Sequence, residues 1–225
     1  MTIGFCVRKR QRRVEQSTID AFRELPVANV SDCMSRMYAG GARLRPIHDA
    51  RSVLAGPALT VRTRPGDNLM LHHALDIAEP GDVIVVDAGG DLTTAILGEI
   101  MVAIAKKRGV AGIIVNGAIR DADEIRRMDF PLYAAGVTHR GPYKDGPGEV
   151  NTTIAIDGMV IEPGDLVLAD GDGVLTVPFD QTETILAATR RKQDAEQVEM
   201  AKIADGSVER GWVMESLQSR GCEFE

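Results

Sequence analysis

The stretch from Pro80 to Asp121 decides the fold: PGDVIVVDAGGDLTTAILGEIMVAIAKKRGVAGIIVNGAIRD. Two short runs in it, 83–87 and 112–116, are apolar on both faces, as in strands buried inside a parallel sheet. The segment between them has helical spacing and ends in the basic turn 106–108 followed by Gly109, which is typical of a helix C-terminus. The pattern therefore predicts a strand, a helix and a second strand.

Residues that follow this stretch extend the unit. A short helix is expected at 122–128 and a third strand at 131–133, which gives a β-α-β-α-β unit with parallel strands. In the first helix of the unit, Ile100, Ala103 and Ile104 share one face. The sequence thus predicts an α/β fold with this unit at its centre.

Turn residues mark the neighbouring elements. Asp157-Gly158 indicates a hairpin, and 170–173 is expected to be a tight turn between two further strands. An extended stretch at 58–63 precedes the central unit. Three Pro-Gly-Asp triplets predict tight turns with Gly at positive φ; they are Pro65-Gly66-Asp67, Pro80-Gly81-Asp82 and Pro163-Gly164-Asp165.

Helices are expected at both ends of the chain. Within 15–40, Ser17 is predicted to cap one helix, and Ser31 or Asp32 to cap a second that stops at Gly40-Gly41. A charged helix is expected over about 181–205. No linker interrupts the sequence, so we expect a single domain over 1–225.

Charge and composition limit the function. The net charge is −7, which argues against non-specific nucleic-acid binding. The basic run Arg8 to Arg13 is interpreted as a solvated first helix or a partner contact. No apolar run suggests a leader or a membrane span, and Cys6, Cys33 and Cys222 are too scattered for a zinc site or a disulfide framework, so a cytoplasmic protein with reduced thiols is expected.

Several possible sites are set aside. A calcium loop beginning at Asp170 would need Glu at its twelfth position, where Gln181 stands. The adjacent His72 and His73 point in different directions on any regular element, which favours structural roles. His139, in the glycine-rich loop from Gly136 to Gly148, is a candidate for the mouth of a pocket. The sequence contains no glycine-rich nucleotide loop.

One pair of segments carries the strongest chemical signal. Gly98 to Met101 begins the helix after the first buried strand, where free N–H groups suit a small anion. Arg120 and Asp121 follow the next strand, at the sheet edge where ligands bind in α/β folds. Arginine can hold a carboxylate at two points, and aspartate can bind a hard divalent cation.

A structural explanation of the same residues stays open. Asp121 could cap the helix that starts at Ala122, with Arg120 in a surface ion pair. Glu99 could be an acidic first-turn residue stabilised by the helix dipole.

At these residues the chain resembles the family of 4-hydroxy-4-methyl-2-oxoglutarate aldolases and regulators of ribonuclease activity A. The resemblance covers roughly 25–180. Its aldolase members share an acidic residue, a gap of twenty residues and then Arg-Asp, which is matched here by Glu99, Arg120 and Asp121. The first position is more usually Asp in that family, and the longer Glu99 could shift the base or its water.

The resemblance implies a swivelling β/β/α fold in a trimer or a pair of trimers. It implies an aldolase that cleaves a 4-hydroxy-2-oxo acid to pyruvate and also decarboxylates oxaloacetate, with Mg²⁺ or Mn²⁺ held by Asp121. Arg120 and the segment Gly98, Glu99, Ile100 and Met101 would bind the substrate, and Glu99 would be the base. Glu196 or Glu199 would reach the site of a neighbouring subunit.

Three other interpretations remain. The chain could regulate a ribonuclease without chemistry, although the complete set of Glu99, Arg120 and Asp121 favours an enzyme. A methyltransferase would need a glycine-rich cofactor loop after 83–87, and Ala88-Gly89-Gly90-Asp91 lacks its spacing. A binder of 2-oxo acids would release no product.

Overall fold

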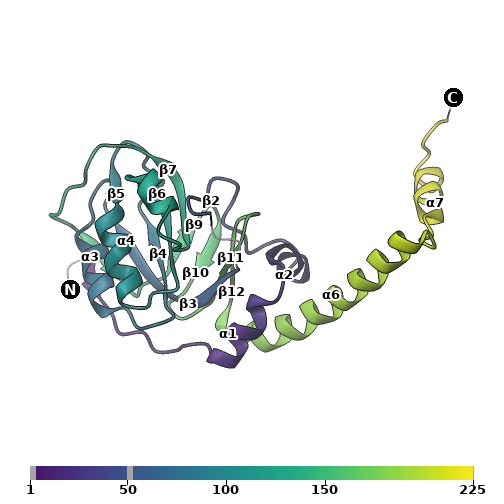
Figure 1. Ribbon diagram of the computed structural model, residues 1–225, viewed down its shortest axis with the longest axis horizontal. Coiled ribbons are helices and arrows are strands. Elements are labelled where there is room, and N and C mark those ends of the chain that lie inside the picture. Colours follow the sequence, from purple (N-terminus) through teal and green to yellow (C-terminus); the bar gives the residue numbers. More distant parts are fainter. Residues whose placement is uncertain (1–3, 50–52, 225) are drawn as a thin grey trace. The chain divides into compact units, whose positions relative to one another are not determined.

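Four parallel strands form the centre of the sheet in the computed structural model, which describes residues 4–49 and 53–224. They are β3 (Leu54–Thr63), β4 (Val83–Asp87), β6 (Gly112–Ile119) and β7 (Leu132–Val137), each hydrogen-bonded to the next in that order. β4 and β6 have no solvent-facing side, because both of their faces are covered. The predicted parallel unit is confirmed (Figure 1).

Short strands complete this sheet. β8 (Gly148–Val150) pairs with β3 in the antiparallel sense, and β1 (Phe5–Val7) pairs with β8. At the other side β2 (Arg45–Pro46) pairs with β7, and β5 (Ala95–Leu97) runs parallel to the end of β6. These four strands were not predicted, because they are too short to show a period.

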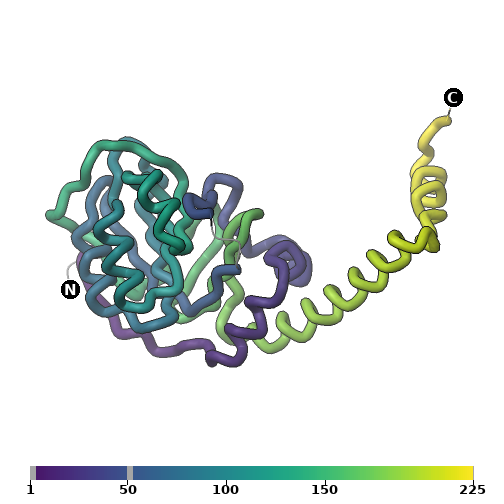
Figure 2. Tube along the Cα trace, viewed as in Figure 1, coloured from purple at the N-terminus to yellow at the C-terminus, as the bar shows by residue number. Residues whose placement is uncertain are grey.

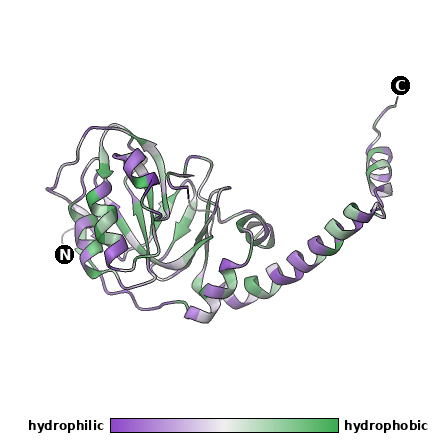
Figure 3. Cartoon of the chain, viewed as in Figure 1, coloured by the Kyte–Doolittle hydropathy of each residue, from purple (hydrophilic) through white to green (hydrophobic). Residues whose placement is uncertain are grey.

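Helices cover one face of the sheet. They are α3 (Leu69–Ile77), α4 (Glu99–Lys107) and α5 (Ala122–Arg126). Met101, Val102 and Ala105 of α4 pack with the strands in one core. The face with Ile100, Ala103 and Ile104 is instead open to solvent, and Ile100 is 73% exposed. Figure 3 shows green, apolar residues on the strands and a mixture of green and purple residues on these helices.

The other face of the sheet is covered by strands. The predicted hairpin, β9 (Ile154–Ile156) with β10 (Met159–Ile161), contributes to a core with β4 and β6. β11 (Leu166–Ala169) pairs with β3 and with β12 (Val174–Val177), as the turn at 170–173 predicted. The mixed α/β fold class is thereby confirmed.

Two helices near the amino terminus pack on β11 and β12. They are α1 (Gln16–Arg23) and α2 (Val27–Cys33). The predicted caps are wrong, because Ser17 lies inside α1, and Ser31 and Asp32 lie inside the last turn of α2. The second helix ends at Cys33, before Gly40-Gly41, and Pro26 stands at its N-cap position, where its fixed φ suits a helix start.

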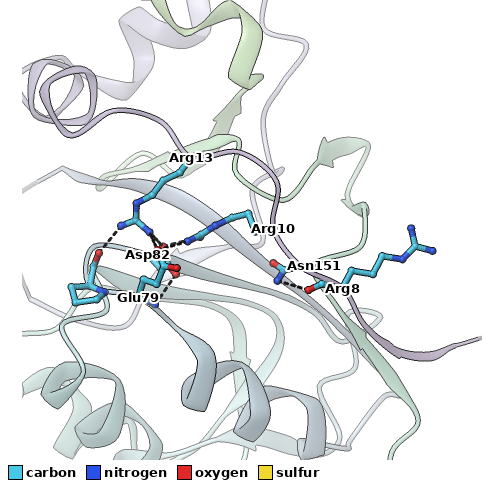
Figure 4. A network of polar contacts seen from close by, with 7 residues as sticks. Arg8, Arg10, Arg13, Glu79, Asp82 and Asn151 are labelled. Carbon is cyan, nitrogen blue, oxygen red and sulfur yellow. Dashed lines mark hydrogen bonds and ion pairs between the residues drawn. The ribbon is translucent and has the colours of Figure 1, made fainter.

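The basic run Arg8 to Arg13 forms no helix, so that part of its interpretation is wrong. It is extended along the molecule between β1 and α1, as the purple start of the tube shows in Figure 2. Arg10 and Arg13 both bind the buried carboxylate of Asp82, at 2.8 and 2.6 Å (Figure 4). Arg12 binds Asp165 at 3.0 Å. The run therefore holds two of the Pro-Gly-Asp turns, those of Asp82 and Asp165, through ion pairs.

The chain divides into two compact units, Met1–Thr189 and Arg190–Glu225. The second contains the later part of α6 (Thr182–Asp205), which confirms the predicted charged helix, and α7 (Gly211–Ser219). None of the helices in the described residues is long and apolar enough to cross a membrane.

Candidate functional site

Two chain segments meet where β6 ends and α4 begins. Arg120 and Asp121 follow the last residue of β6, and Gly98 occupies the N-cap position of α4. The N–H of Arg120 donates to the carbonyl oxygen of Leu97 at 2.9 Å, which fixes the two segments side by side. The juxtaposition predicted from the sequence is thus present.

Asp121 is directed across this junction. Its Oδ2 accepts a hydrogen bond from the N–H of Glu99 at 3.1 Å and lies 3.6 Å from Nε of Arg120. It stands at the N-cap position of α5, but its side chain makes no capping hydrogen bond there. Its φ is 58°, a left-handed conformation that Asp tolerates better than most residues. The structural alternative of a simple helix cap therefore does not describe this side chain.

Gly98 permits the close approach. A Cβ atom at this position would lie 2.5 Å from Oδ2 of Asp121 and 3.0 Å from Cγ of Arg120. Both contacts are shorter than van der Waals distance, so any larger residue would push Arg120 and Asp121 away from the helix start. The glycine is required by space, since its φ of −147° is open to other residues.

A pocket of about 340 Å³ opens at this junction. Of the residues predicted to form the site, Gly98, Ile100, Met101, Arg120 and Asp121 line it. Arg120 and Asp121 are partly open to solvent, with side chains 43% and 39% exposed. A partly open arginine beside a carboxylate is suited to hold an anionic ligand together with a cation.

The other residues that line the pocket were not predicted as part of a site. It comprises Asn68 at the start of α3, His72 within α3, and Gly141, Pro142 and Lys144 from the loop after β7. Burial lowers the pKa of His72, and the charge of Lys144 lowers it further. His72 had been expected to be structural, and no local pattern in the sequence links these distant segments.

Other candidate residues lie elsewhere. The side chain of Glu99 is exposed and is not among the pocket-lining residues, although its N–H binds Asp121. His139 is exposed and does not line the pocket either. Glu196, in the second unit, pairs with Lys192 at 2.8 Å, and Glu199 is exposed on the same helix.

Asp121 is the carboxylate among the residues that line the pocket. No cluster of three or more His, Cys, Asp or Glu side chains with metal-binding geometry occurs within residues 4–49 and 53–224. Zinc sites usually need such a cluster, whereas Mg²⁺ is commonly held by one or two carboxylates and several waters. In the described part of the chain, Oδ1 of Asp121 accepts no hydrogen bond and is free to bind such an ion.

Several known proteins resemble this chain in sequence and in fold. A Halalkalibacterium halodurans protein named "Putative 4-hydroxy-4-methyl-2-oxoglutarate aldolase" is 37% identical over 86% of this chain and 91% of its own length. Among solved structures, the RNA-processing inhibitor RraA from Thermus thermophilus is 33% identical, with a TM-score of 0.63, and the match covers 68% of this chain and 92% of that one.

A second solved structure matches more of the fold. It is an uncharacterized protein from Pseudomonas syringae pv. tomato, 25% identical, with a TM-score of 0.79 over 88% of this chain and 97% of that one. The family model described as RraA-like (Aldolase/RraA) matches residues 27–176, which include both segments of the site. The chain belongs to the RraA-like family.

Proposed function

We propose that this protein is a divalent-metal-dependent lyase that cleaves a 4-hydroxy-2-oxo acid such as 4-hydroxy-4-methyl-2-oxoglutarate to pyruvate. The observation that carries the proposal is the placement of Arg120 and Asp121 against the start of α4, in one open pocket. The aldolase name of the 37%-identical relative supports the same reaction class.

Asp121 would hold the metal, Mg²⁺ or Mn²⁺, through its free carboxylate oxygen, with water at most of the remaining positions. When bound, such an ion supplies a Lewis acid beside the 2-oxo group of the substrate. The hydrogen bond from the N–H of Glu99 and the ion pair with Arg120 hold the carboxylate in a fixed orientation.

Arg120 would stabilise the charge that develops during cleavage. When the bond between C3 and C4 breaks, its electron pair moves through C3 and C2 to the 2-oxo oxygen, and an enolate forms. The guanidinium group of Arg120 and the N–H of Ile100 in the first turn of α4 can donate to this oxygen and to the carboxylate of the substrate. Protonation of the enolate at C3 then gives pyruvate.

A base must accept the proton of the C4 hydroxyl group, so that C4 leaves as a carbonyl. We assign this role to Glu99, acting directly or through a water, because it is the acidic residue closest in sequence to the helix start. The same enolate-stabilising residues would decarboxylate oxaloacetate, from which carbon dioxide leaves in place of the carbonyl product.

The subunit arrangement is part of the proposal. We propose a homotrimer or a pair of trimers, in which Glu196 or Glu199 of one subunit reaches the site of the next. The exposed face of α4, with Ile100 and Ile104, offers an apolar surface next to the pocket for such a neighbour.

A second candidate function is regulation of an RNA-processing enzyme by binding alone. The similarity to the Thermus thermophilus protein, which is described as an RNA-processing inhibitor, favours it. It predicts that Asp121 and Arg120 can be replaced without loss of function, and that the protein forms a stable complex with a protein partner.

The test is pyruvate release from 4-hydroxy-4-methyl-2-oxoglutarate and from oxaloacetate, measured with added Mg²⁺ and with excess chelator. We expect release that chelator abolishes and that falls by about 10²–10³ in Arg120→Ala. Arg126→Ala, an exposed arginine on α5 that does not line the pocket, is the matched control and should keep full activity. Release that survives complete metal removal would contradict the metal-dependent mechanism.

A further inference from the structure

We propose that Asp67 is a positioning residue, whose buried carboxylate holds the loop after β7 (138–147) against the guanidinium group of Arg120. The inference rests on the proposed function, because Arg120 is the residue assigned there to stabilise the enolate. The side chain of Asp67 is 0% exposed and is not among the residues that line the pocket. Its effect on the reaction therefore passes through the residues that it holds.

Asp67 binds the loop through backbone groups. Its Oδ2 accepts the N–H of Asp145 at 2.7 Å and that of Gly146 at 2.9 Å, and its Oδ1 accepts the N–H of Leu69 at 2.9 Å. Hydrogen bonds to an ionised carboxylate are stronger than those between neutral groups, and burial strengthens them further. One side chain thus joins the loop to the start of α3.

Backbone hydrogen bonds next to Asp67 place the loop in the same position. The N–H of Tyr143 donates to the carbonyl oxygen of Gly66 at 2.8 Å, and the N–H of Asn68 donates to that of Tyr143 at 3.0 Å. The residues on either side of Asp67 therefore bind the loop as well. Of these attachments, the bonds to the carboxylate can be removed by a single substitution.

The same loop lies against Arg120. A Cβ atom at Gly141 would lie 3.1 Å from Nη1 of Arg120, which is shorter than ordinary van der Waals contact. The guanidinium group is thus confined by the loop backbone at Nη1 and by Asp121, whose Oδ2 lies 3.6 Å from Nε. Because the Arg120 side chain is 43% exposed, displacement of the loop would allow it to adopt other rotamers.

Asp67→Asn should misplace Arg120 without removing it. One carboxylate oxygen becomes an NH₂ group, which cannot accept an N–H, so bonds to the loop or to Leu69 are lost. Misplacement by about 1 Å can cost about 10²-fold in rate, and we expect kcat for pyruvate release to fall about tenfold. In an Arg120→Ala background, Asp67→Asn should cause no further loss, because the group that it positions is absent.

Asp82→Asn is the matched control. Asp82 is also 0% exposed and accepts a backbone N–H together with two arginines, but it lies at the amino end of β4. Both variants should unfold at a lower urea concentration than the wild type, whereas kcat per folded molecule should fall in Asp67→Asn alone. An equal kcat in the two variants, or a further tenfold loss in the Arg120→Ala background, would overturn the proposal.

Gly141→Ala tests the contact from the loop and leaves Asp67 intact. The φ of Gly141 lies outside the left-handed region, so alanine fits the backbone, but its Cβ displaces Nη1 of Arg120 by a few tenths of an ångström. We expect kcat to fall about fourfold, with little change in stability. If Asp67→Asn does not fold, an unchanged kcat in Gly141→Ala overturns the proposal.

The position of Arg120 can also be observed without turnover, in the ¹H–¹⁵N spectrum of the arginine Nε–H groups. The signal of Arg120 is assigned by its absence in Arg120→Lys. We expect it to shift in Asp67→Asn and in Gly141→Ala, but not in Asp82→Asn. An unchanged signal in the first two variants contradicts the positioning role whatever the rates. If the signal shifts as expected but the wild type releases no pyruvate, the lyase proposal fails while the positioning of Arg120 stands.

Discussion

The two ends of the parallel sheet carry clusters of arginine and aspartate that differ in what satisfies them. At the amino ends of β4 and β11, Asp82 and Asp165 receive Arg10, Arg12 and Arg13 from the extended amino-terminal segment. At the carboxyl end of β6, Arg120 and Asp121 have one ion pair between them and face a pocket. The residue types are the same in both clusters. In the first cluster, however, arginines of the same chain bind the aspartates.

The two clusters also differ in how deeply their aspartates are buried. The side chain of Asp82 is 0% exposed, and it also accepts the N–H of Glu79 at 2.9 Å. Burial raises the pKa of Asp165, while hydrogen bonds from the N–H groups of Glu162 and Phe179 and the charge of Arg12 act in the opposite direction. A pocket of about 350 Å³ exists at this end too, lined by the basic run. At this end the buried carboxylates of Asp82 and Asp165 are bound by arginines of the same chain, whereas Asp121 faces an open pocket.

Replacing Asp82 should give the largest effect on stability. Asp82→Ala leaves Arg10 and Arg13 without the carboxylate that both bind, and loss of one partner of a buried pair costs about 3–5 kcal/mol. Urea unfolding would measure the change. Asp123→Ala, which removes an exposed acid of α5, should change stability by less than about 0.5 kcal/mol. Pyruvate release per folded molecule should be equal in both variants. A loss of release in Asp82→Ala alone would show that the cluster around Asp82 also affects the reaction.

Gly98→Ala should damage activity more than stability. Its Cβ would lie 2.5 Å from Oδ2 of Asp121, so Arg120 and Asp121 must move away from α4. Misplacement of reacting groups by about 1 Å can cost about 10²-fold in rate, and we expect a loss of ten- to a hundredfold in kcat. Gly171→Ala, with open space around its Cβ, is the control. Full activity in Gly98→Ala would show that the close approach is not needed.

His72 should give the smallest effect, as a dependence of stability on pH. Its pKa in the folded protein lies below the ordinary 6.5, because burial disfavours the charged ring. The unfolded chain therefore binds more protons than the folded one below pH 6.5. The contribution is complete above that pH and is lost as the pH falls toward the folded-state pKa. In urea unfolding between pH 5 and 8, His72→Gln should show a weaker loss at acidic pH. If His72→Gln and the wild type show the same dependence of stability on pH, the buried ring of His72 does not contribute to it.

Local patterns predicted the centre of the fold well. The strands at 83–87 and 112–116 and the hairpin around Asp157-Gly158 were predicted because buried apolar runs and turn residues act over a few positions. The caps assigned to Ser31 and Asp32 were wrong, because Pro26 starts that helix earlier and its packing against β12 outweighs capping preference.

Long-range contacts explain what the sequence did not reveal. The basic run forms no helix, because its arginines bind carboxylates about 70 and 150 positions away in the chain. Likewise Asn68 and Lys144 reach the pocket of Arg120 only through the fold. The two segments of the site that could be predicted, at Gly98 and Arg120, lie at the ends of adjacent elements of one β-α-β unit.

The most direct test of the account is pyruvate release from 4-hydroxy-4-methyl-2-oxoglutarate by the wild type, Asp121→Ala and Asp123→Ala, each loaded with Mg²⁺ and shown to be folded. The two aspartates are two positions apart, but Asp121 lines the pocket and Asp123 does not. We expect rapid release by the wild type and Asp123→Ala, and release reduced by at least about 10² in Asp121→Ala. Equal rates in all three proteins, or no release by any of them, would contradict it.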